Sequence, residues 1–129
     1  MGKSFVRNQL PAIFYMVLIF VMSSIPHVTL PDVGVRWEDK IVHLVEYLAL
    51  SFLLGRAFYF QKWHSLSIEQ AARLALWVAV FYAATDELHQ YFVPGRFADV
   101  WDWVADSVGA YLGMLVIRIR LQLAHEASS

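Results

Sequence analysis

The sequence predicts an all-α integral membrane protein, a bundle of four transmembrane helices. Hydrophobic residues make up 59% of the 129-residue chain and aromatic residues 16%, whereas soluble domains are about 45–50% apolar. A single domain of this size cannot bury so much apolar surface, so we expect the excess to face lipid. Four segments are long enough to cross a membrane, and alternation with a period of two is absent.

The first predicted span covers residues 10–25. Pro11 stands at a tolerated helix start, and Pro26 follows directly after the end. The basic residues Lys3 and Arg7 before it are typical of a signal peptide, but residues 23–26 form a poor cleavage site. We therefore expect this span to be retained in the protein.

The other predicted spans cover residues 39–60, 71–91 and 99–117. The third must continue through the polar residues 86–90, because its apolar part alone is too short for about 30 Å of hydrocarbon. No internal repeat and no long linker divides the sequence. Residues 1–129 are therefore predicted to form one domain.

Basic residues are unequally shared between the two ends of these spans, which predicts the orientation. Three lie at one end: Arg36, Lys40 and Arg96. Seven lie at the other: Lys3, Arg7, Arg56, Lys62, Arg73, Arg118 and Arg120. The richer end is expected in the cytoplasm, together with both termini. The loops at residues 26–40 and 92–98 then face outward.

Most of the acidic residues fall near the predicted outer end. Helix rise places Glu46, Asp86 and Asp106 at a similar depth, about 6–12 Å below the outer surface. Ionisable groups in a lipid-spanning segment are costly, so they are rare without a partner or a function. The three depths predict one pocket that opens outward.

Helical spacing assigns polar residues to three helix faces that would line this pocket. The first face contains Asp39, His43, Glu46 and Tyr47, and the second contains Asp86, His89 and Gln90, with Glu87 one step around. The third contains Asp99, Asp102, Asp106, Gly109 and Gly113. We interpret the two glycines as a surface on which another helix packs closely.

The candidate residues support three hypotheses, and the sequence does not decide whether the protein is an enzyme. In the first, it acts on an envelope lipid or a lipid-linked precursor, with clustered carboxylates as acid and base and histidines as proton shuttles. The candidate catalytic residues are His43, Glu46, Asp86, Glu87, His89, Asp102 and Asp106. The candidate substrate-binding residues are Lys40, Tyr47, Gln90, Arg96 and Asp99. Of these, Arg96 either pairs with Asp99 or Glu87 or receives an anionic ligand.

The second hypothesis is a metal-dependent hydrolase or transferase. Histidine and carboxylate stand three residues apart in His43-x-x-Glu46 and in Asp86-x-x-His89, and facing pairs of this kind hold divalent metals in helical bundles. The third hypothesis is a membrane protein that binds a ligand or has a structural role, without catalysis. The sequence also allows a homo-oligomer. The chain has no cysteine and no basic patch, so thiolate sites and nucleic-acid binding are not expected.

Three motifs in order resemble the signatures of the VanZ-like membrane proteins. They are Asp39-Lys40-x-x-His43-x-x-Glu46-Tyr47, then Asp86-Glu87-Leu88-His89-Gln90 with Val93-Pro94-Gly95-Arg96, and finally Asp102-x-x-x-Asp106-x-x-Gly109. The resemblance covers almost the whole chain. It implies a multi-pass protein of the bacterial cytoplasmic membrane that serves the cell envelope. The family's namesake is linked to antibiotic resistance, towards teicoplanin, which an arbitrary member need not share.

Overall fold

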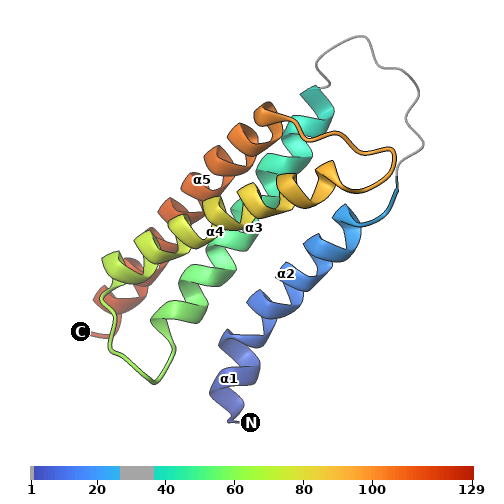
Figure 1. Ribbon diagram of the computed structural model, residues 1–129. Helices are drawn as coiled ribbons and strands as arrows, with labels where there is room; N and C mark the ends of the chain where they lie inside the picture. The colour runs from blue at the N-terminus through green and yellow to red at the C-terminus, as the bar shows by residue number, and fades with distance from the viewer. Residues whose placement is uncertain (1, 27–36) are drawn as a thin grey trace.

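The computed structural model describes residues 2–26 and 37–129, and within these ranges it contains helices and no strand. There are five: α1 (Lys3–Asn8), α2 (Leu10–Ser23), α3 (Trp37–Tyr59), α4 (Ile68–Tyr91) and α5 (Val100–Glu126). The predicted all-α class is therefore confirmed. Both termini lie at the same end of the bundle as the α3–α4 loop, and the α4–α5 loop lies at the opposite end (Figure 1).

The four longer helices coincide with the four predicted spans, with differences at their ends. α4 begins at Ile68 rather than at residue 71, and α5 continues to Glu126 rather than ending at residue 117. Among the described helices, α3 is the one that is both long and apolar enough to cross a membrane, while α2 is apolar but has 14 residues. One membrane-length apolar helix is thus established, and four spans remain a prediction.

The break between α1 and α2 follows from Pro11, which has no N–H to donate to the carbonyl of Arg7. That carbonyl instead accepts a hydrogen bond of 2.9 Å from the guanidinium of Arg56 on α3. One residue before α2, the side-chain amide of Gln9 donates to the carbonyl of Ala57 at 2.9 Å. The start of the chain is therefore attached to the end of α3 through polar contacts.

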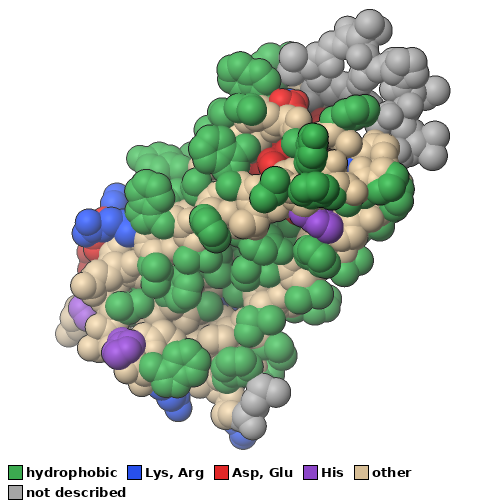
Figure 2. Space-filling view, in the orientation of Figure 1, with side chains coloured by type: hydrophobic (Ala, Val, Ile, Leu, Met, Phe, Trp, Pro, Cys, Tyr) green, Lys and Arg blue, Asp and Glu red, His purple; other side chains and the backbone are tan. Residues whose placement is uncertain are grey.

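The helix α4 presents small side chains to the bundle and large ones to the outside. Its alanines at four-residue intervals, Ala71, Ala75, Ala79 and Ala83, are fully buried. On its outer side, Trp77 and Phe81 are 67% and 72% exposed. Figure 2 shows hydrophobic side chains over most of the visible face. Small residues inside and large apolar residues outside are typical of helices that associate in lipid.

The helices α3 and α5 pack most closely of all, at the two glycines of α5. A Cβ atom added to Gly109 would meet the backbone carbonyl of Leu44, and one added to Gly113 would meet that of Leu48. The interpretation of these glycines as a packing surface is confirmed. Their close approach also brings Asp106 and Asp102, one and two turns before Gly109 in α5, against the first turns of α3.

Candidate functional site

Six ionisable residues from α3, α4 and α5 meet at the end of the bundle opposite the termini. We call them the acid–histidine cluster: Lys40, His43, Glu87, Asp99, Asp102 and Asp106. All six were candidate site residues in the sequence. Asp106 is fully buried, and Glu87 and Asp102 are 7% and 6% exposed.

The ammonium group of Lys40 joins α3 to α5 through two carboxylates. Its Nζ donates to Oδ2 of Asp99 at 2.6 Å and also to Oδ1 of Asp102. The side chains of Lys40 and Asp102 are 13% and 9% exposed, whereas that of Asp99 is 41% exposed. Lys40 was a candidate for binding substrate. In the structure its ammonium group is paired with two carboxylates of the same chain.

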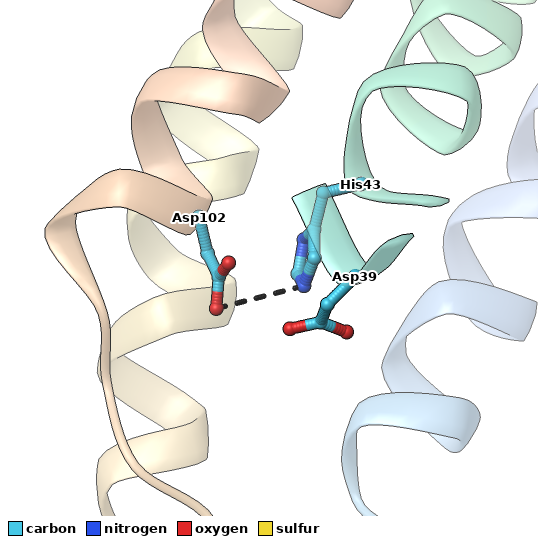
Figure 3. A group of neighbouring side chains, drawn as sticks. All are labelled: Asp39, His43 and Asp102. Carbon is cyan, nitrogen blue, oxygen red and sulfur yellow. Dashed lines mark ion pairs between the residues drawn. The ribbon is translucent and has the colours of Figure 1, made fainter. Parts of the chain in front are cut away.

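His43 lies between two aspartates of α5. Its Nδ1 is 2.9 Å from Oδ1 of Asp106, and its Nε2 is 3.7 Å from Oδ2 of Asp102. Figure 3 shows the ring of His43, from α3, directed towards Asp102 of α5, with Asp39 beside it. A carboxylate at one ring nitrogen fixes the orientation of the imidazole and leaves the other edge for proton exchange or a ligand.

Glu87 connects α4 to the start of α5. Its Oε2 accepts a hydrogen bond of 3.0 Å from the backbone N–H of Asp99. Its Oε1 is buried and has no hydrogen-bond partner among the described residues, and the same holds for Oδ2 of Asp106. A buried carboxylate oxygen without a partner is costly, so each needs an explanation.

The candidates Glu46, Asp86, Tyr47 and Gln90 lie outside the acid–histidine cluster. Asp86 is buried and accepts a hydrogen bond of 3.3 Å from the amide of Gln90, one turn later in α4. Glu46 is half-buried. Tyr47 is fully buried, and its hydroxyl has no partner within the described part of the chain. Among the described residues, no hydrogen bond or ion pair joins these four residues to the acid–histidine cluster.

His89 and Arg96 turn towards α2 rather than towards the other candidates. Nε2 of His89 is 2.9 Å from the hydroxyl of Ser24, and its ring stacks on Phe20. Arg96 donates to the carbonyls of Met22 and Ile25 at 2.8 and 3.2 Å. Within the described residues it forms no ion pair with Asp99 or Glu87. It instead donates to the last carbonyls of α2, which lack a full set of helical donors, since Pro26 has no N–H to donate to the carbonyl of Met22.

Two groups of three side chains come within 4.8 Å of one another through potential metal-ligating atoms. One group is His43, Glu87 and Asp106, and the other is Asp39, His43 and Asp102. The set expected from the sequence, His43, Glu46, Asp86 and His89, is not brought together in this way within the described residues. His43 contacts Asp106 of α5, whereas Asp86 bonds within α4 and His89 contacts the end of α2.

A family model with the description VanZ/LLP1 matches residues 9–121 of the chain. The chain belongs to the VanZ/LLP1 family. The resemblance inferred from the three motifs is thereby confirmed. Neither the curated proteins nor the solved structures contain a match to the chain.

The range matched by the VanZ/LLP1 family contains the complete acid–histidine cluster. The chemistry available there is proton transfer at His43 and ligation through carboxylate oxygens. Two cavities of about 290 and 390 Å³ lie elsewhere, one beside Gly2, Phe5 and Trp63 and the other beside Arg7 and Arg120. Neither is lined by residues of the cluster, so the open pocket expected from the sequence remains a prediction.

Proposed function

We propose that this VanZ/LLP1 protein is a multi-pass protein of the bacterial cytoplasmic membrane that binds a lipid-linked or other cell-envelope substrate at its outer end. The observation that carries the proposal is the acid–histidine cluster, which three helices build at one end of an otherwise apolar bundle. Both termini and the α3–α4 loop lie in the cytoplasm in this proposal.

The surface of the bundle supports the membrane location. α3 is long and apolar enough to cross by itself, and α4 and α5, with 24 and 27 residues, would reach about 36 and 40 Å at about 1.5 Å per residue. Large apolar side chains stay exposed along these helices, including Trp77, Phe81 and Val116. Lipid is the medium in which such exposure is favourable.

The charge distribution supports the orientation. Lys3, Arg7 and Lys62 belong to α1 and the α3–α4 loop, at the end that carries the termini, and the acid–histidine cluster belongs to the other end (Figure 1). Cytoplasmic loops carry an excess of lysine and arginine. Arg36 and the other residues of 27–36, predicted to belong to the outer loop, lie outside the described part of the chain.

The energetic cost of the cluster supports a function beyond helix packing. A charged side chain at the centre of a membrane helix costs about 2.5–3.5 kcal/mol. A polar contact between helices stabilises the folded state by only about 0.6 kcal/mol on average in one membrane protein. The cost applies most directly to Asp106, which is fully buried within α5. Packing alone does not explain this carboxylate, whereas a binding site does.

Labelling of single cysteines tests the orientation, and the absence of native cysteine makes each variant unambiguous. We expect a membrane-impermeant maleimide to modify Ala98→Cys in intact spheroplasts. We expect it to modify Ser65→Cys and Ser128→Cys only after the membrane is permeabilised. All three positions are exposed. The opposite pattern of labelling would show that the cluster faces the cytoplasm.

Lipid analysis tests the binding. Protein extracted together with its surrounding membrane is expected to be enriched severalfold in one class of envelope lipid or lipid-linked precursor, detected by mass spectrometry. Asp106→Asn should remove the enrichment, because it changes the charge at the centre of the cluster. Glu69→Gln, an acidic position at the other end of α4, should retain it. Lipid identical to the bulk membrane in the wild type would refute the proposed function.

A further inference from the structure

We propose that His43, Glu87 and Asp106 bind one divalent transition-metal ion, for which Zn²⁺ is the natural probe. This inference goes beyond the binding of an envelope substrate and does not depend on it. It rests on the position of one imidazole and two carboxylates, which come from α3, α4 and α5 and whose ligand atoms lie within 4.8 Å of one another.

Two buried oxygens give independent evidence for a ligand at this position. Oε1 of Glu87 and Oδ2 of Asp106 are both inaccessible and have no hydrogen-bond partner among the described residues. Each belongs to a side chain whose other oxygen already has a partner, the N–H of Asp99 or the ring of His43. The N–H of Asp99 thus orients Glu87 as a second-shell partner orients a metal ligand. The contact between His43 and Asp106 holds these two proposed ligands side by side.

The basic side chains of Lys40 and Arg96 form their hydrogen bonds with other groups than Glu87 and Asp106. Lys40 donates to Asp99 and Asp102, and Arg96 donates to the carbonyls at the end of α2. Among the described residues, Glu87 has no ion pair, and the ion pair of Asp106 is with His43. A divalent cation would balance the two carboxylates that these basic side chains leave uncompensated.

The ligand types favour zinc-like ions. Imidazole binds Zn²⁺ and other late transition metals, and Zn²⁺ also accepts carboxylate oxygen. Bonds of about 2.0–2.1 Å in a tetrahedral site place ligand atoms about 3.3 Å apart, so modest side-chain movements would close the three around an ion. Three protein ligands leave a fourth position for water or a substrate oxygen, as in catalytic zinc sites.

The second group of three is the weaker candidate. Asp39 is exposed, and Asp102 already shares the ammonium of Lys40. A cation there would lie next to a positive charge. The two groups share only His43, so variants of Asp39 and Glu87 separate them.

The test uses full-length protein purified in detergent through a tag without histidine, free of added substrate. After metal removal by a chelator and addition of Zn²⁺, we expect one zinc per chain by elemental analysis. His43→Gln and Glu87→Gln should each weaken zinc binding by at least about tenfold. Asp39→Asn and Glu69→Gln should retain it. In the wild type, zinc should raise the unfolding temperature, and in Glu87→Gln it should not.

Several results would overturn the metal site. They are the absence of stoichiometric zinc in the wild type, full zinc binding by both His43→Gln and Glu87→Gln, and loss of zinc in Asp39→Asn with retention in Glu87→Gln. If the variants do not fold, X-ray absorption spectra of the zinc-loaded wild type test the site instead. We expect them to show one imidazole nitrogen and oxygen atoms as the remaining zinc ligands. Because zinc binding is measured without added lipid, failure here leaves the lipid analysis unaffected, and the reverse also holds.

Discussion

Gly109→Ala is expected to lower the free energy of unfolding by about 3 kcal/mol, the upper part of the range for overpacked cores. The added Cβ would meet the carbonyl of Leu44, which belongs to the backbone of α3 and cannot rotate away. The two helices must separate instead, and their separation would also disturb His43 and Asp106. Thermal or denaturant unfolding of the purified protein in detergent measures the change.

Two other glycines, Gly55 and Gly2, provide graded controls. A Cβ atom on Gly55 would come within 2.7 Å of Cγ2 of Ile117, which belongs to a side chain that can adjust. A Cβ atom on Gly2 would have no neighbour within 4 Å. We therefore expect Gly55→Ala to have a smaller effect than Gly109→Ala, and Gly2→Ala to have none. Equal stability of Gly109→Ala and Gly2→Ala would contradict the close packing of α3 and α5.

Lys40→Met is expected to destabilise the protein by about 3 kcal/mol, the loss typical when one partner of a buried ion pair is removed. The variant leaves Asp102, with a side chain only 9% exposed, without its cation. Asp99 contributes less to the loss, because its side chain is 41% exposed and solvent screens exposed pairs. Unfolding experiments at pH 7 report the change.

A double-mutant cycle isolates the interaction between Lys40 and Asp102. Asp102→Asn removes the charge that Lys40→Met leaves uncompensated, so the double variant should be more stable than Lys40→Met alone. Lys62→Met, at an exposed position of the α3–α4 loop, should leave stability unchanged. Strictly additive effects of the two cluster substitutions would show that this ion pair does not stabilise the fold.

The helices could be predicted from the sequence because their signals are local. Apolar runs and the prolines at positions 11 and 26 located α2, and small residues at four-residue spacing located the contact of α5. The extension of α5 to Glu126 was missed, since the polar residues after position 117 have no breaker among them and continue the helix beyond the apolar run.

The residues of the candidate site could be predicted from the sequence better than the side chains and carbonyls that each of them contacts. Periodicity places residues on a face of one helix, but it does not determine how neighbouring helices are rotated against each other. Glu87 was predicted at the margin of its helix face, yet in the structure it belongs to the acid–histidine cluster. Asp86 was predicted to lie on that face, yet it accepts a hydrogen bond from Gln90 of the same helix. The role of Arg96 depended on the end of α2, which is distant in sequence and carries no charge that could have indicated it.

The attachment of α2 has a consequence for how a lipid would reach the outer end. Tyr82 and His89 hold α2 through one hydrogen bond each, to Met16 and Ser24, and Arg96 holds its end through two. Large side chains such as Phe14 remain 66% exposed. α2 also makes far less contact with α4 than α3 and α5 do. Among the four longer helices we therefore expect α2 to separate from the bundle at the lowest cost. Under the proposed function, an acyl chain would reach the outer end by passing between α2 and α4 without leaving the bilayer.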